Sequence, residues 1–456
     1  MKKSTLLLVM IVCLMGLAGC NGKPQESGKN VESSKQDEGS KEDNLLKSNF
    51  KIASEDFKPG NTSIVKTDKG YYYYSAEKAG LCYADAVTGK EMYLCNKPEC
   101  RHDGNEFCVA TTDRYWIKKF CLYGGTLFAT AVEETDTQYL YKLLTIALDG
   151  SEMNEVTTYY TLEKGQQKAS PYSDGRQLLM HRNKVIFPME IMGQENLADA
   201  TYYGLGILDL NTMEMTFVDE EAISKENPES RNISVHGDYV YFCRTEGKKT
   251  VLYRYHMTEG TKESYKLLVG FSGTYLVLDD DTVIYTKRSG NVLCVHHHAT
   301  GENEEKVRLT KIVKMHLSDG SVVENTQDYK VGNLVTDGVN IYVAEQGKIT
   351  YVSTNPETGE TEEISEMKLH VFNRDLEETE TVELSDIISP MEWEGVEGGL
   401  YSQPRMFSYV GDEVYTTFSP EDNMADVYTF RCKLEDLLDG KPEFELVYSD
   451  LYSARE

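Results

Sequence analysis

The residues with the clearest capacity for chemistry lie in the segment LCNKPECRHDGNEFC, residues 94–108. Within it, Cys95, Cys100, His102 and Cys108 follow the spacing C-x4-C-x-H-x5-C. Three thiolate sulfurs and one imidazole nitrogen are the four ligands that a tetrahedral Zn²⁺ prefers. The spacing predicts a structural zinc site. Such a site would be closed to substrate because protein side chains fill every coordination position.

The same cysteines also allow disulfide bonds. Most extracellular compartments are oxidising, and a bond between Cys95 and Cys108 would close the loop and leave Cys100 to pair elsewhere or stay free. Anaerobic surroundings would not force the thiols to oxidise, so free thiols are a third interpretation. A metal site and a disulfide framework would both have a structural role.

The other polar motifs indicate structure rather than catalysis. The sequence contains no G-x-S-x-G, H-E-x-x-H, P-loop or dinucleotide-binding glycine pattern. His296–His298 would lie on a strand, where neighbouring side chains point to opposite faces and only two of the three can share an ion. The acids of LDDDT, Leu278–Thr282, are adjacent instead of alternating as in a calcium loop, so we expect a turn there.

The first twenty residues have the organisation of an export signal. Two lysines precede an apolar run, Leu6–Leu17, that is too short to span a bilayer. The run ends in LAGC, residues 17–20, which resembles the lipobox of bacterial lipoproteins. The resemblance implies a lipoprotein signal peptide over residues 1–19. It also implies that Cys20 carries a diacylglyceryl group, commonly with a further acyl chain such as palmitate, which makes a stable anchor.

We therefore expect a chain held to the cell membrane through the lipid on Cys20 alone, facing outside the cytoplasm. Residues 20–48 are rich in Ser, Lys, Glu and Gly, which predicts a disordered tether. About thirty flexible residues reach roughly 30 Å, enough to lift a domain clear of the lipid head groups. Residues 49–456 then form the folded domain. An ordinary secretory signal or an uncleaved anchor is the alternative.

The charge of the chain restricts its partners. The formal net charge is −28 over 456 residues. A surface this acidic repels phosphate-rich partners, which argues against binding to nucleic acid or anionic lipid. The charge is typical of a soluble exported domain and is compatible with a basic partner. No segment after the signal peptide has the eighteen or so continuous apolar residues of a membrane span.

A repeated unit, a turn followed by a short aromatic strand, organises the rest of the chain. The 31 tyrosines lie mostly in short runs with valine, isoleucine and threonine between Gly, Asp or Asn turns, which is typical of strands. DKGYYYY from residue 68 and GDYVYFC from residue 237 are two of the seven copies. The copies align on Tyr73, Phe128, Phe187, Tyr241, Tyr285, Tyr342 and Tyr415.

A strand running into a hairpin follows most copies of this unit. The clearest examples are LCYADAVTGK from residue 81, LYRYHMTEGT from 252, VLCVHHHATGE from 292 and TYVSTNPETGE from 350. A four-stranded sheet cannot bury both faces alone, so the copies must stack. With a unit near fifty residues, this predicts an all-β fold, a β-propeller with seven blades of four antiparallel strands.

Two hairpin-like segments and two cysteines stand out in this alignment. KMHLSDGSVVE from residue 314 and LHVFNRDLEETETVEL from residue 369 lack the aromatic partner strand, which leaves eight blades as the alternative. Cys82 and Cys294 each stand seven residues before a glycine of the hairpin, so they are predicted to occupy equivalent, buried strand positions.

The repeat G-D-x-V-Y-F followed by L-Y-x-x-x-x-x-T-G resembles the low-density-lipoprotein-receptor-like and TolB-like propellers, and especially a set of propeller lipoproteins exported by anaerobic Gram-positive bacteria. Members of that set often carry a segment matched here by Leu94, Cys95, Asn96, Pro98, Cys100 and His102. The resemblance covers most of the chain and implies a fold and a location but no reaction. The Tyr-Trp-Thr-Asp stretch of the receptor propellers is absent, so their ligand-binding residues do not carry over.

The candidate ligand site is SDIISPMEWEGVEGGLYSQPRMFSY, residues 385–409, which we expect to be a long loop over one face of the propeller. It holds Trp393, one of two tryptophans, together with Tyr401 and Arg405. These three residues are the ligand-binding candidates, with an aromatic platform for a sugar or peptide. A structural cover for the central channel is the alternative.

The sequence therefore predicts a monomeric, lipid-anchored cell-surface propeller that acts as a non-enzymatic binding module for a peptide, protein or glycan. Propeller enzymes assemble their sites from single residues on several blades, so a hydrolase or lyase acting on polysaccharide or peptide is the alternative. An accessory subunit of an envelope complex is a third hypothesis. Structural zinc is the one metal or cofactor that the sequence suggests.

Overall fold

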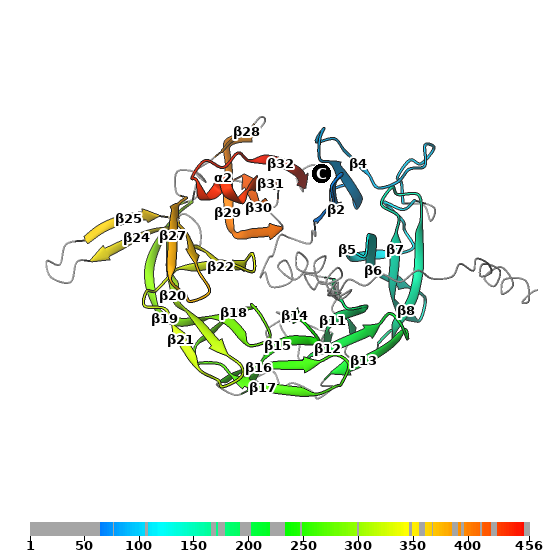
Figure 1. Cartoon of the computed structure of the whole chain (residues 1–456). Coiled ribbons are helices and arrows are strands. Elements are labelled where there is room, and N and C mark those ends of the chain that lie inside the picture. The colour runs from blue at the N-terminus through cyan, green and yellow to red at the C-terminus, as the bar shows by residue number, and fades with distance from the viewer. Residues whose placement is uncertain are drawn as a thin grey trace, which may run out of the picture. The chain divides into compact units, whose positions relative to one another are not determined.

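Seven antiparallel sheets make up the fold, and they are the blades of a β-propeller (Figure 1). In this computed structural model each blade takes its four principal strands from one stretch of the chain. First strands contact one another between blades 1 and 2, 2 and 3, 4 and 5, 5 and 6, and 6 and 7, and the fourth strands lie toward the outside of the ring. The structure describes residues 64–75, 77–104, 108–165, 170–171, 178–191, 202–218, 233–246, 249–298, 301–345, 349–354, 361–366, 368–384, 391–393, 396–410, 413–420 and 426–450.

The blades are numbered in chain order. Blade 1 contains β1 (Val65–Lys66), β2 (Gly70–Ser75), β3 (Gly80–Asp85) and β4 (Glu91–Tyr93). Blade 2 contains β5 (Trp116–Tyr123), β6 (Thr126–Glu134), β7 (Gln138–Ile146) and β8 (Met153–Glu163). Blade 3 contains β10 (Leu179–His181), β11 (Lys184–Ile191), β12 (Tyr202–Asp209) and β13 (Glu214–Val218), with β9 (Ser170–Pro171) paired to β11. Blade 4 contains β14 (Ile233–His236), β15 (Tyr239–Glu246), β16 (Lys249–His256) and β17 (Lys262–Lys266). Blade 5 contains β18 (Phe271–Val277), β19 (Thr282–His298), β20 (Gly301–His316) and β21 (Val322–Glu324). Blade 6 contains β22 (Val331–Thr336), β23 (Ile341–Glu345), β26 (Lys368–Phe372) and β27 (Glu378–Glu383). Blade 7 contains β29 (Val396–Val410), β30 (Glu413–Pro420), β31 (Val427–Lys433) and β32 (Glu445–Asp450), with β28 (Met391–Trp393) paired to β29. The short helix α2 (Leu434–Leu438) follows β31.

The seven-blade prediction is confirmed, and the aligned aromatic residues explain why it succeeds. All seven lie on the second strand of their blade: β2, β6, β11, β15, β19, β23 and β30. Six are buried and Phe128 is half-buried. Apolar clusters built around these strands together join every pair of neighbouring blades. Burial of an aromatic or branched side chain contributes roughly 1.5–3 kcal/mol, so stacking the blades is what stabilises each sheet.

Blades 7 and 1 close the ring by side-chain contacts. Among the described strands, those of blade 1 all come from the N-terminal side and those of blade 7 all from the C-terminal side. Tyr73 stacks on Tyr448, with ring centroids 4.2 Å apart and an interplanar angle of 16°. Glu413 lies across the same seam: its Oε2 is 2.9 Å from Lys66 Nζ, and its Oε1 accepts a hydrogen bond from Arg431 at 2.5 Å. The closing contacts therefore include this aromatic stack, the edge-to-face pair of Tyr71 and Tyr415 with centroids 6.2 Å apart, and one carboxylate with two cations, beside a shared apolar cluster.

Blades 5 and 6 share an insertion that the repeat pattern misassigned. Between β23 and β26 the chain forms the hairpin β24 (Ile349–Thr354) and β25 (Thr361–Glu366), which extends away from the blades (Figure 1). Cys294 in the long β19 pairs with Tyr351 of β24, so the end of the β19–β20 hairpin and the inserted hairpin form one sheet.

The hairpins from residues 292 and 350 are thus additions to the blades. The regular hairpins between third and fourth strands are β20–β21 and β26–β27, which contain the two segments from residues 314 and 369 that lacked an aromatic partner strand. These segments therefore belong to blades 5 and 6 and not to an eighth blade. The predicted equivalence of Cys82 and Cys294 is also wrong. Cys82 lies on the third strand of blade 1 and Cys294 on the second strand of blade 5.

We predict that Glu413→Gln destabilises the propeller by about 2 kcal/mol, because the seam then loses the buried negative charge that pairs with the cations of Lys66 and Arg431. For a domain of this length that loss lowers Tm by roughly 2 °C, measured by calorimetry at neutral pH. Burial alone would raise the pKa of Glu413, but the hydrogen bonds and cations around it hold that pKa below its ordinary value.

The contribution of Glu413 is therefore present above the pKa of an unfolded glutamate, about 4.3, and is lost as the pH falls through the lower pKa of the folded state. The difference in Tm between wild type and Glu413→Gln should shrink over that acid range. Glu435→Gln is the matched control, since Glu435 faces Lys433 at 3.4 Å on an exposed surface and should change Tm little. Equal effects of the two substitutions would contradict the role given to the seam.

Candidate metal centre

The four predicted ligands lie together in the connection between β4 of blade 1 and β5 of blade 2. One ligand atom from each of Cys95, Cys100, His102 and Cys108 lies within 4.8 Å of all the others. Cys108 is buried and the other three are half-buried. Ligands placed tetrahedrally at about 2.3 Å (Zn–S) and about 2.0 Å (Zn–N) lie roughly 3.5–3.8 Å apart. A small contraction of the loop would give that geometry, so the set can hold a metal ion.

Backbone hydrogen bonds fasten this loop to both blades. Leu81 N–H of β3 in blade 1 donates to Ala110 O at 2.9 Å. Asn96 N–H donates to Gly150 O at 3.2 Å, in the turn between β7 and β8 of blade 2. The first and last ligands of the loop adjoin these two anchor points. A metal ion bound here would therefore tie blade 1 to blade 2.

Gly150 is placed where a side chain cannot fit. Its φ is +70°, in the left-handed region that glycine adopts without strain. A Cβ atom at this position would lie 2.6 Å from Cys95 N and 2.6 Å from Leu94 C. Both contacts are with backbone, which cannot rotate away. The close approach of this turn to the loop thus depends on glycine.

His102 is held in an unusual conformation against the cluster. Its φ is +55°, a region that costs a non-glycine residue roughly 1–2 kcal/mol. Its ring stacks on Tyr93 with centroids 4.4 Å apart and an interplanar angle of 27°. Its Nδ1 lies 3.4 Å from Cys108 Sγ. Strained residues of this kind gather at functional sites, and here the conformation is found where the imidazole lies beside Cys108 Sγ.

The sulfur atoms receive hydrogen bonds from the loop itself. Cys108 Sγ accepts from the N–H and the hydroxyl of Thr111, at 3.3 and 3.2 Å. Burial and the neighbouring Cys108 raise the pKa of Cys95, while the backbone of Lys97 and Val109 opposes this shift by hydrogen bonding. No disulfide joins the seven cysteines that the structure describes: Cys82, Cys95, Cys100, Cys108, Cys121, Cys243 and Cys432.

The other predicted site residues fall outside what the structure describes, wholly or in their side chains. Cys20 lies outside the described residues. Trp393 ends β28, and Tyr401 and Arg405 lie in β29, with side chains outside the described part of the chain. Their backbone belongs to the sheet of blade 7, so the long loop expected over residues 385–409 is wrong for its described part. The Gly and Pro residues that suggested a loop are accommodated where the register shifts between β28 and β29 and between β29 and β30.

Trp116 is a surface residue that sequence reasoning did not select. It is the first residue of β5, the innermost strand of blade 2, and its exposed fraction is 51%. It follows the metal loop directly, next to Tyr115, whose ring lies 4.9 Å from the guanidinium of Arg114. Large aromatic side chains with an accessible face are common ligand platforms. The signal that distinguishes Trp116 is its exposure, which the sequence does not contain.

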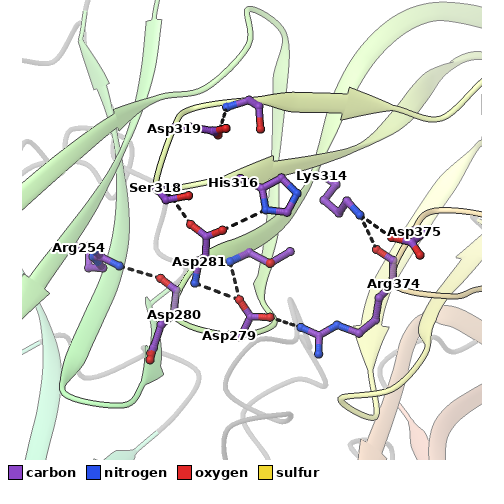
Figure 2. Close-up of polar contacts among 12 residues, drawn as sticks. Arg254, Asp279, Asp280, Asp281, Lys314, His316, Ser318, Asp319, Arg374 and Asp375 are labelled. Atoms are coloured by element: carbon purple, nitrogen blue, oxygen red, sulfur yellow. Dashed lines mark hydrogen bonds and ion pairs between the residues drawn. The ribbon is translucent and has the colours of Figure 1, made fainter.

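The acidic run predicted to be a turn is one, and Figure 2 shows it between three blades. Asp279 pairs with Arg374 of blade 6, Arg254 of blade 4 donates to Asp280 O at 2.7 Å, and Asp281 Oδ2 lies 3.1 Å from His316 Nδ1 within blade 5. Hydrogen bonds from Ser318 and His316 hold the pKa of Asp281 below its ordinary value. This turn therefore connects blades 4, 5 and 6.

No protein-family model and no curated protein matches the chain by sequence. Similar solved structures include a prolyl endopeptidase (TM-score 0.43, 13% identity, over 90% of this chain and 52% of that one). They also include the β-propeller domain of the Trilobed protease from Pyrococcus furiosus (TM-score 0.39, 12% identity, 73% and 82%) and TolB from Acinetobacter baumannii (TM-score 0.33, 13% identity, 84% and 78%). The chain spans about half the length of the prolyl endopeptidase. Similarity at these identities says nothing about activity.

In the part of the chain that the structure describes, no helix has the length and apolar character needed to cross a membrane.

We predict that Gly150→Ala loosens the candidate metal centre. The added Cβ must displace the backbone at Leu94 and Cys95, which should cost about 2 kcal/mol beyond the strain of a positive φ. The matched control is Gly320→Ala, since Gly320 has φ +71° with nothing within 4 Å of the added Cβ. The measurements are Tm and the rate at which a thiol reagent modifies the native protein. Equal losses of Tm for the two variants would show that the approach of Gly150 to the loop is not tight.

Proposed function

We propose that this chain is a lipid-anchored cell-surface β-propeller that binds a peptide, protein or glycan without catalysing a reaction. We propose further that zinc bound by Cys95, Cys100, His102 and Cys108 ties its first two blades together. The zinc is supported by four ligand atoms, one from each of these residues, that all lie within 4.8 Å of one another in the connection between blades 1 and 2. In the described residues other charged side chains also cluster where blades meet, as at the seam of Glu413 and the turn of Figure 2.

The anchor is proposed from the sequence. The LAGC stretch that ends in Cys20 resembles a lipobox, and residues 20–48 have the composition of a tether. Such a tether would hold the propeller above the membrane surface with freedom to turn. The proposed location is therefore the outer side of the cell membrane.

Two features support a role in binding. Trp116 is a large aromatic residue with an exposed fraction of 51% at the start of the innermost strand of blade 2, and the inserted hairpin β24–β25 extends away from the blades (Figure 1). The net charge of −28 favours a basic peptide or protein over an anionic ligand. Trp393, Tyr401 and Arg405 stay candidates for the same ligand. A hydrolase or lyase is the alternative and would need titratable side chains from several blades to converge on the channel.

Zinc fits the cluster for three physical reasons. Three sulfurs and one imidazole nitrogen are the ligands that structural zinc prefers, and all four come from protein, which leaves no open position for substrate. The stack of Tyr93 on His102 and the hydrogen bonds from Thr111 to Cys108 are the outer contacts that orient metal ligands. The loop is anchored to both blades independently of the metal.

We predict one equivalent of zinc in the full chain purified without oxygen, measured by elemental analysis. Cys100→Ser should lose most of this zinc and lower Tm, because it removes one of the four ligands. The matched control is Cys432→Ser, which alters a buried cysteine of β31 outside the cluster and should keep the zinc. A chelator should lower the Tm of wild type and leave Cys100→Ser unchanged. Equal zinc contents in wild type and Cys100→Ser would exclude the assigned ligand set.

We predict that Cys20→Ala, expressed in a bacterium that processes lipoproteins, moves the chain from the membrane fraction to the medium. The released chain, incubated with peptide and polysaccharide libraries, should retain a subset of them without forming products detectable by mass spectrometry. Unchanged membrane association would contradict the lipid anchor. Product formation would instead support the hydrolase or lyase.

A further inference from the structure

A group of ionisable side chains is buried where the inserted hairpin leaves blade 6. Glu345 ends β23 just before the hairpin, and His370 lies near the start of β26 just after it. Lys330 precedes β22 beside them. The exposed fractions of Lys330, Glu345 and His370 are 6%, 4% and 7%. Burying ionisable groups costs free energy unless they are paired, so this arrangement requires an explanation.

His370 stands between two carboxylates. Its Nδ1 lies 2.8 Å from Glu378 Oε1, and its Nε2 lies 3.8 Å from Glu345 Oε1. The second distance is that of an ion pair and too long for a hydrogen bond. Among the described residues, His370 Nε2 and Glu345 Oε2 make no hydrogen bond. On its far side, Glu345 Oε2 lies 4.0 Å from Lys330 Nζ.

The buried group around His370 is also linked to blade 5, whose strands β19 and β20 form one sheet with β24 and β25. Tyr329 OH donates to Glu378 Oε2 at 3.0 Å. The backbone of Tyr329 pairs with that of Thr310 on β20 through hydrogen bonds of 2.9 and 2.8 Å. β20 is the strand whose first half belongs to the sheet shared with β24 and β25. His370 and its neighbours thus lie at the base of both parts of that sheet.

We propose that His370 is a proton-controlled latch at the neck of the inserted hairpin. When both ring nitrogens carry protons, the imidazolium faces a carboxylate on each side and holds Glu345 and Glu378 together. After loss of one proton, the ring donates to Glu378 alone and turns a lone pair toward Glu345. The strands that enter and leave the hairpin, β23 and β26, then keep their backbone pairing but lose the ion pair between His370 and Glu345.

The surroundings of His370 favour the protonated state. Burial lowers the pKa of His370, but the carboxylates of Glu345 and Glu378 raise it by more, so it lies above the ordinary value. The charged groups that face it are Glu345 from β23, Glu378 from β27 and, beyond Glu345, Lys330 from the segment before β22. The pKa of Glu378 is held below its ordinary value, so this partner stays ionised. The stabilisation is complete below the pKa of an unfolded histidine, about 6.5, and is lost as the pH rises through the higher pKa of the folded state.

The test is hydrogen–deuterium exchange of the full chain, read in peptides that cover β24 and β25 and corrected for the intrinsic effect of pH. Protection of these strands should be about tenfold lower at about pH 8.5 than at about pH 5.5, the change expected for one hydrogen bond or ion pair to a charged group. His370→Gln should show the lower protection at both pH values. The matched control is His236→Gln. His236 ends β14, far from the inserted hairpin in the chain, and its Nδ1 lies 2.8 Å from Asp280 Oδ1. This variant should keep the wild-type dependence of protection on pH.

Equal protection of β24 and β25 at the two pH values in the wild type would overturn the proposal, whether or not the variant folds. Retention of the full pH dependence in His370→Gln would overturn it as well, because another group would then be titrating. The outcome does not depend on the lipid anchor or on zinc, so failure here and failure of the proposed function are distinguishable.

Discussion

Closure of the ring between blades 7 and 1 is the contact on which the other blades depend. A sheet with two apolar faces is stable only between two neighbours, and in the described residues no strand passes from one end of the chain into the sheet at the other. The stack of Tyr73 on Tyr448 excludes water from this seam and contributes on the order of 1 kcal/mol beyond the area it buries. Glu413 can be buried beside it because cations and hydroxyl groups satisfy both of its oxygens.

The interfaces within the chain repeat this solution at the turns between first and second strands. Tyr123 of blade 2 accepts a hydrogen bond from Asn183 N–H of blade 3 at 2.8 Å. Arg182 of blade 3 pairs with Asp238 of blade 4, and the acidic turn of Figure 2 continues the series to blade 6. The chain has 47 lysines and arginines against 75 acids, so cations are the scarcer partner. The cations placed between blades offset part of the self-repulsion of an acidic chain.

The repeat was predictable because the residues that form it are fixed by packing on both faces. The second strand of every blade needs a bulky side chain at one position, and that requirement is visible as seven aligned aromatic residues. The hairpin signal at residues 292 and 350 failed for a physical reason: a Thr-Gly turn reports the local bend and not which two strands of a blade it joins. Only pairing with a neighbouring blade distinguishes an inserted hairpin from a regular one. The same limit applies to residues 396–410, where a strand with shifted register keeps the Gly and Pro content of a loop.

The metal loop was predictable in its ligands and not in its setting. Spacing alone grouped Cys95, Cys100, His102 and Cys108, because their side chains are close in sequence. The stack on Tyr93 and the approach of Gly150 could not be predicted, since they depend on where two blades meet. The pair of Glu345 and His370 could not be predicted from the sequence for the same reason, since a whole hairpin lies between its members.

Both sites occur where the chain leaves the repeat, in the connection between β4 and β5 and at the inserted hairpin. Positions inside the repeat are packed by apolar side chains from both neighbouring blades. The metal loop and the group around His370 are accommodated where that packing is interrupted, and such interruptions give this fold room for chemistry.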